Sequence, residues 1–136
     1  MQQETLVTVG VLLLALVTVE SGGVFLTRVL SGDVPATDFQ RGFYRAGHAH
    51  AAVLLVLSIA ILSVVDAATL TAPWDAVARF GVPIAAILMP AGFFLSAIGR
   101  GRERPNRWVL LLWVGVLVLT VSLIVAGIGF IASGLS

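Results

Sequence analysis

Four long apolar stretches constrain the fold of this chain more than any other feature. They run from about residue 5 to 30, 46 to 65, 80 to 98 and 108 to 135. About 20 apolar residues in a helix cross a hydrocarbon core of about 30 Å, so each stretch is long enough to span a membrane. We therefore predict an all-α integral membrane protein, a four-helix bundle in which residues 1–136 form one transmembrane domain.

The composition agrees with a chain that lies in lipid. Of its 136 residues, 59% are hydrophobic and only 11% are charged, which is more apolar surface than one small soluble core can bury. The net charge of +1, without any long basic run, argues against a nucleic-acid partner. Cysteine is absent, which excludes disulfides and thiolate-ligated metals. The first predicted partner is the lipid bilayer.

The arginines predict how the helices cross the membrane. Seven of the eight basic residues flank the first and third connecting segments. Short segments rich in Arg stay in the cytoplasm, so we expect both termini outside and a multi-pass protein of the cell inner (plasma) membrane. Arg28, Arg41 and Arg45 are then placed to contact lipid headgroups or a cytoplasmic anion. The residues before the first stretch carry no basic charge, so we expect a retained helix and not a cleaved signal peptide.

Local signals in the first connecting segment predict an early start for the second helix. Thr37 or Asp38 is a suitable N-cap for a helix that begins at Phe39. Phe39 and Phe43 would share one face of that helix, four residues apart, and lie along the headgroups.

Stripes of small residues predict where the helices approach one another. Helices in lipid pack closely where small side chains let their backbones meet. The third stretch carries such a stripe at Gly81, Ala85, Gly92, Ser96 and Gly99, and the fourth carries Thr120, Gly127 and Gly134 in line with Trp113. We interpret both stripes as packing faces, within one subunit or between subunits.

Glu20 is the one ionisable residue deep within a predicted span. A carboxylate in the hydrocarbon core must be protonated, paired or exposed to a water-filled cavity. Gly22 and Gly23 follow it after Ser21 and leave space beside it. Acids in this position often bind protons or metal ions, so Glu20 is a candidate proton-transfer residue and metal ligand.

Two histidines enter the second span from its arginine-rich end. A spacing of two residues places His48 and His50 about 200° apart on a helix, so they must face different neighbours. His48 lies nearer the side of Gly47, which we take as the bundle interior. Both histidines are candidate metal or haem ligands, and His48 is a candidate proton-transfer partner of Glu20, within one subunit or across subunits. Met89 is a candidate axial haem ligand.

The segment Gly47-His48-Ala49-His50, within residues 45–55, resembles a His-x-His pattern of small four-helix bacterial membrane proteins that are distantly similar to haem-copper oxidase subunit I. The resemblance implies that a histidine here ligates a b-type haem. Because the chain has no third histidine, the second ligand would come from another subunit or from Met89. A second, architectural resemblance is to the MAPEG family of trimeric glutathione-dependent membrane enzymes. It is carried by four spans, external termini and the Arg41, Arg45 and His48 side chains.

These features favour a membrane protein with a Glu/His site that binds a haem or a divalent transition metal or serves redox chemistry. Three alternatives stay open: a proton-coupled small transporter or ion channel that acts as an oligomer, an accessory subunit of a larger membrane complex, and a MAPEG-like enzyme. A homo-oligomer or larger complex is expected in each case. The Ser and Thr residues form no nucleophile-base-acid pattern, which argues against a hydrolase.

Overall fold

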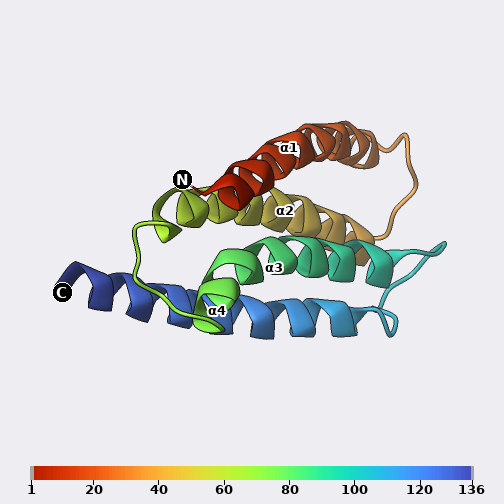
Figure 1. Cartoon of the computed structure of the whole chain (residues 1–136). Coiled ribbons are helices and arrows are strands. Elements are labelled where there is room, and N and C mark those ends of the chain that lie inside the picture. Colours follow the sequence, from red (N-terminus) through yellow and green to blue (C-terminus); the bar gives the residue numbers. More distant parts are fainter. Residues whose placement is uncertain (1, 136) are drawn as a thin grey trace.

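The computed structural model describes residues 2–135 and consists of long helices joined by short segments (Figure 1). α1 spans Gln3–Leu30, α2 spans Asp38–Val65, α3 spans Trp74–Ala97 and α4 spans Val109–Leu135. All four helices are long and apolar enough to cross a membrane. The prediction of an all-helical, multi-pass membrane protein is therefore confirmed.

α2 begins well before the apolar stretch that predicted it. Thr37 caps the helix, because its hydroxyl accepts a hydrogen bond from the Gln40 backbone N–H and the Gln40 side chain accepts one from the Thr37 N–H. The rings of Phe39 and Phe43 lie 4.3 Å apart between centroids. The predicted cap at Thr37 and the shared face of the phenylalanines are confirmed, with the helix starting at Asp38.

The side-chain amide of Gln40 also fastens the start of α2 to the end of α3. It is buried, and its Nε2 donates to the carbonyl oxygens of Ala97, at 2.9 Å, and Gly99, at 2.7 Å. Ala97 is the last residue of α3, where backbone acceptors lack partners within the helix itself, and Gly99 lies two residues beyond it. Gln40 therefore supplies a side-chain donor to the last carbonyl of α3 and to the segment that follows the helix.

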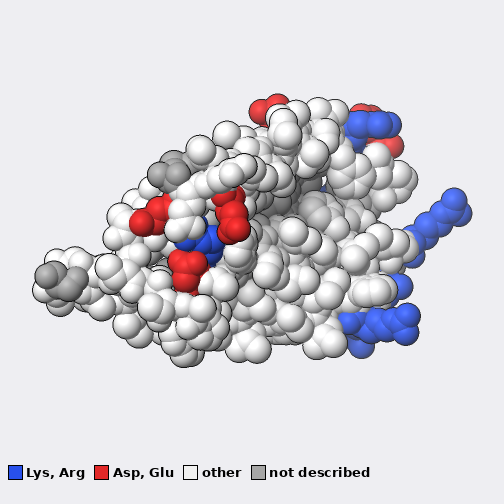
Figure 2. Space-filling view, viewed as in Figure 1, with Lys and Arg blue, Asp and Glu red and all other residues white. Residues whose placement is uncertain are grey.

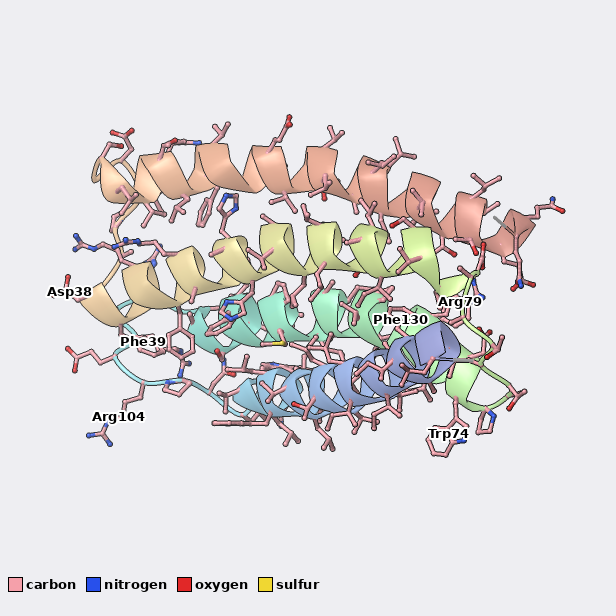
Figure 3. The ribbon with its side chains drawn as sticks, turned by 90° about the vertical axis from the view of Figure 1, so that its left-hand side faces the viewer. Asp38, Phe39, Trp74, Arg79, Arg104 and Phe130 are labelled. Atoms are coloured by element: carbon pink, nitrogen blue, oxygen red, sulfur yellow. The ribbon has the colours of Figure 1, made fainter. Side chains whose placement is uncertain are left out.

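The helices pack in the order of the chain, with α1 chiefly on α2, α2 on α3, and α3 on α4 (Figures 1 and 3). Of the four helices, α3 is the most buried. Half of its most apolar stretch is buried within the protein, whereas only 6% of the most apolar stretch of α1 is buried. Leu62 of α2 and Val82 and Ala85 of α3 are fully buried at the centre of the core. α1 is consequently an outer helix that leaves most of its surface open to lipid.

Small residues of α3 allow α4 to approach closely. A Cβ atom added at Gly81 would lie 2.5 Å from the Ser122 Cβ, and one added at Gly92 would collide with the Leu112 backbone. The stripe predicted on α3 is confirmed within the helix, where Gly81, Ala85, Gly92 and Ser96 are all buried. Gly99 lies beyond the end of α3 and is exposed.

The stripe predicted on α4 does not pack against this chain. Trp113 and Thr120 are exposed, and a Cβ added at Gly127 or Gly134 would have no neighbouring atom within 4 Å. The face that packs is a different one, and its buried residues are Gly115, Ser122, Ala126 and Gly129. The physical reason is that α4 is apolar around its whole circumference, so its sequence pattern does not mark the buried side.

Candidate functional site

Glu20 lies on the exposed face of α1 and within the length of helix that crosses the membrane. About 15 Å of helix separates it from Leu30, at about 1.5 Å per residue. Its carboxyl group forms no hydrogen bond or ion pair with any residue from 2 to 135. The structure thus leaves this acid without a partner among residues 2–135, on the outer surface of the bundle.

His48 lies in the contact between α2 and α1. Its imidazole packs against two glycines: a Cβ added at Gly22 would lie 3.6 Å from Nδ1, and one added at Gly23 would lie 3.5 Å from Cε1. The ring is half-buried, and neither nitrogen has a hydrogen-bond partner among the described residues. Gly22 and Gly23 therefore make room for an imidazole whose nitrogens are uncommitted.

His50 faces the opposite neighbour. Its ring centroid lies 5.0 Å from that of Phe93 on α3, and its Nδ1 donates to the Ala46 carbonyl oxygen at 2.8 Å. The two imidazoles therefore contact different helices, as their spacing of two residues predicted. His48 can bind a ligand through either ring nitrogen, whereas His50 uses its Nδ1 for a hydrogen bond within its own helix.

The structure does not bring the predicted site residues together in one chain. No hydrogen bond joins Glu20 to either imidazole, because Glu20 is on the exposed face of α1 while His48 meets the face that packs on α2. Met89 is buried between α3 and α4, where its Cγ lies against Gly115. Among residues 2–135, no group of three His, Asp or Glu side chains is placed to hold a metal ion.

Aromatic rings link three helices at the histidine end of the protein. Tyr44 of α2 lies between Phe25 of α1, with ring centroids 5.4 Å apart, and Phe94 of α3, with centroids 5.8 Å apart. Phe43 and Phe93 make a further edge-to-face pair at 5.4 Å. These contacts hold α1, α2 and α3 in fixed register around the level of the imidazoles.

The arginines predicted to contact headgroups lie at this same end (Figure 2). Arg28 and Arg45 are exposed, and their guanidinium groups have no partner within the described part of the chain. Arg41 donates to the Ala36 carbonyl oxygen at 2.9 Å and lies 3.7 Å from the Asp38 carboxylate. Two of the three arginines are therefore available to an external anion.

A buried ion-pair network at the opposite end was missed from the sequence. Arg79 of α3, which is 3% exposed, donates to Asp66 at 2.7 Å, to Asp75 at 3.1 Å and to the Thr5 hydroxyl at 2.6 Å (Figure 3). The hydrogen bond from Arg79, followed by that from the Gln2 backbone N–H, lowers the pKa of Asp66 from 3.8 to about 2. The network ties together the ends of three helices.

Only half of this network has a signal in the sequence. Asp75 and Arg79 are four residues apart, a spacing that places oppositely charged side chains side by side on a helix. Asp66 lies at the end of α2 and Thr5 lies near the start of α1, and no local sequence pattern connects either residue to Arg79. All of the charges in the network are paired, so we assign it to stability and not to ligand binding.

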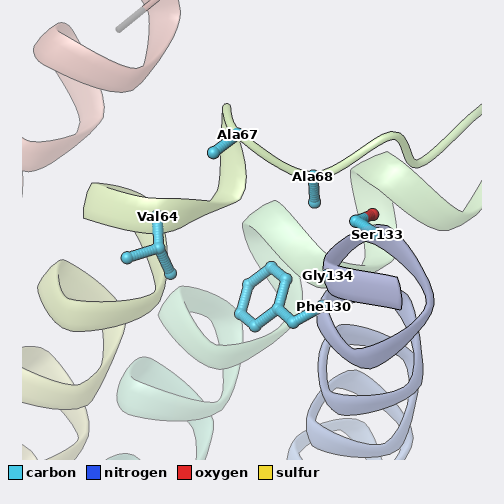
Figure 4. A pocket seen from close by; sticks show the side chains of 6 residues that line it. All are labelled: Val64, Ala67, Ala68, Phe130, Ser133 and Gly134. Carbon is cyan, nitrogen blue, oxygen red and sulfur yellow. The ribbon is translucent and has the colours of Figure 1, made fainter. Parts of the chain in front are cut away.

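A hollow of about 350 Å³ opens between the end of α2 and the end of α4 (Figure 4). Small and apolar side chains line it, and the Ser133 hydroxyl on its rim already accepts a hydrogen bond from the Thr69 N–H. The lining residues are Val64, Ala67, Ala68, Phe130, Ser133 and Gly134. Without a charged group or metal ligand, this hollow is a weaker candidate site than Glu20 or His48.

Comparison of the chain with protein-family models, curated protein sequences and solved structures finds no match. Function must therefore be inferred from the geometry of the side chains themselves.

Proposed function

We propose that the protein is a proton-coupled membrane transporter or ion channel that acts as an oligomer, with Glu20 as the residue that binds the proton. The observation that carries this proposal is the carboxyl group of Glu20, which lies within a span, exposed and without a partner in its own chain. An acidic residue inside the membrane is costly, and its usual roles are in proton or ion pathways.

The chemistry of a carboxyl group suits this role. In a medium of low dielectric constant the neutral, protonated form is favoured, whereas water or a cation beside the carboxyl favours the ionised form. A change in what surrounds Glu20 therefore loads or releases one proton. Because four helices are few to enclose a pathway, we expect further copies of the chain to complete it.

The proposed orientation places the arginine-rich end in the cytoplasm and both termini outside the inner membrane. Its support is the gathering of basic side chains at one end of the protein (Figure 2). In this orientation the exposed guanidinium groups of Arg28 and Arg45 contact anionic headgroups, and Arg41 contributes to the same positive surface.

Proton flux into liposomes tests the proposal. Purified protein is reconstituted with a pH-sensitive dye inside the vesicles, and an acid-outside gradient is imposed with potassium and valinomycin to clamp the voltage. We expect Glu20→Gln to lower the flux at least tenfold. Glu4→Gln is the matched control, because Glu4 is an exposed acid of the same helix near its end, and it should leave the flux unchanged.

Two results would refute a proton pathway through Glu20. The first is a flux in wild-type vesicles no larger than in empty ones. The second is equal flux in the wild-type protein and Glu20→Gln. Circular dichroism of each variant checks that the helices are intact.

A second candidate function, haem or metal binding, is favoured by the free nitrogens of His48. The resemblance to relatives of haem-copper oxidase subunit I implies a b-type haem, which needs one or two axial ligands. Of the three candidate ligands among residues 2–135, one chain offers His48 alone, since His50 faces α3 and Met89 packs against α4. The residues of a single chain therefore do not complete such a site, and we propose that a second copy would provide the other ligand.

The two histidines provide their own control for this candidate. The visible absorbance of the purified protein reports haem, and elemental analysis reports a transition metal. We expect His48→Ala to abolish either signal and His50→Ala to preserve most of it, because the His50 ring packs against Phe93 of α3 while both ring nitrogens of His48 are uncommitted among the described residues. A colourless and metal-free wild-type protein, expressed with haem and metals supplied, would exclude this function.

A further inference from the structure

α1 carries an exposed stripe of residues that has the spacing of a helix-packing seam. Starting at Leu6, its members alternate at four and three residues along the helix, the repeat with which helices pack at small angles. Leu13, Val17 and Val24 are 52%, 60% and 63% exposed, so this stripe faces away from α2. We call it the outer seam, and its residues are Leu6, Gly10, Leu13, Val17, Glu20, Val24 and Thr27.

Glu20 occupies one position of the outer seam, three residues after Val17 and four before Val24. A polar group at one position of an otherwise apolar seam fixes which helix packs there and in which register. Because the carboxyl group has no partner among residues 2–135, the group that satisfies it must come from outside this chain or be water.

We infer that the outer seam of α1 binds the same seam of a second copy, with the two Glu20 carboxyl groups opposite each other. All copies cross the membrane in the same direction, so their α1 helices run parallel. A two-fold axis along the membrane normal then places each seam residue opposite its own counterpart. A protonated carboxyl group is both donor and acceptor, which makes Glu20 complementary to itself.

A second copy fits this seam better than a helix that carries a cation. Arg79 is buried and paired with two carboxylates. The other arginines of the chain lie at the opposite end of the helices from Arg79. No guanidinium group of a second copy is therefore offered at the level of Glu20. Pairing between two carboxyl groups needs at least one of them to be protonated, because the hydrogen bond between them requires a proton.

The inference deepens the proposed function, since it rests on the oligomer and on Glu20 as the proton-binding residue. Two facing Glu20 carboxyl groups share protons. When one of the two groups loses its proton, the contact between the two α1 helices opens or loosens. The seam would then be both the interface and the place where the proton binds.

Disulfide crosslinking tests the seam directly, because the chain has no cysteine of its own. Val17→Cys and Val24→Cys place single thiols on the outer seam. Ile87→Cys is the matched control, since Ile87 is an equally exposed apolar residue of another spanning helix. After mild oxidation in membranes, we expect dimers from both seam variants, at least fivefold more than from the control.

The role of Glu20 is tested in the same background. Adding Glu20→Leu to Val17→Cys should reduce the dimer at least fivefold, whereas Glu20→Gln should retain it, because an amide is also both donor and acceptor. The Glu20 side chain forms no hydrogen bond or ion pair with residues 2–135, so both variants should fold, and circular dichroism verifies this.

Equal crosslinking in the seam and control variants would overturn the inference, as would a crosslink to a different protein in place of a second copy. No effect of Glu20→Leu on the dimer would also overturn it. The proposed function fails separately: a seam dimer with no proton flux refutes the transporter alone, and proton flux without a seam dimer refutes the interface alone.

Discussion

Replacing Gly92 by alanine tests how closely α3 and α4 approach. A Cβ atom at this position would collide with the Leu112 backbone nitrogen and would lie 2.7 Å from the Leu112 Cα and 2.8 Å from its Cβ. Two of these atoms belong to the backbone of α4, so they cannot rotate away as the tip of a flexible side chain can. The helices must separate to admit the methyl group.

The expected magnitude follows from two opposing effects. Overpacking a close contact costs about 1–3 kcal/mol, and the higher helix propensity of alanine offsets up to about 1 kcal/mol of that cost. We expect Gly92→Ala to be destabilised by about 1–2 kcal/mol. In Gly127→Ala the added methyl group meets no atom within 4 Å, so that variant should lose no stability and gain at most about 1 kcal/mol.

Unfolding in mixed micelles measures the difference. The protein is titrated with increasing fractions of sodium dodecyl sulfate, and its helical circular dichroism is followed until it stops changing. The midpoint for Gly92→Ala should fall below that of the wild-type protein, while that for Gly127→Ala should not. If both variants unfold at the same detergent fraction, α3 and α4 are not packed backbone to backbone at Gly92.

The networks at the two ends of the bundle give further predictions for the same unfolding assay. Arg79→Ala should lower stability by about 1–3 kcal/mol, because two carboxylates and a hydroxyl lose their donor; a variant as stable as the wild type would show that the network contributes nothing. Because the pKa of Asp66 falls from 3.8 to about 2 on folding, its contribution is complete above pH 3.8 and is lost as the pH falls toward 2. Asp66→Asn should remove this part of the pH dependence, and an unchanged profile would contradict the assignment. Gln40→Leu should cost about 1–3 kcal/mol, because the Gly99 carbonyl loses its side-chain donor and the Ala97 carbonyl keeps only the 3.5 Å hydrogen bond from the Tyr44 hydroxyl; no change would mean that water replaces the amide.

Local patterns in the sequence predicted those features that depend on one segment alone. The lengths of the apolar stretches identified all four helices, and Thr37 or Asp38 marked the start of α2 because a helix cap involves only neighbouring residues. The opposite orientations of His48 and His50 followed from helical geometry alone. The presence of an acid within the first span was likewise visible in the chain.

The tertiary structure decided which side of each helix meets another helix. Glu20 faces away from the bundle instead of toward His48, and α4 packs through Gly115 instead of Gly127. The ion pair between Arg79 and Asp66 joins two helix ends that no local pattern relates. The physical reason is the same in each case: in lipid, apolar residues lie both inside and outside the bundle, so hydrophobic periodicity does not fix the rotation of a helix, and close packing between distant segments does.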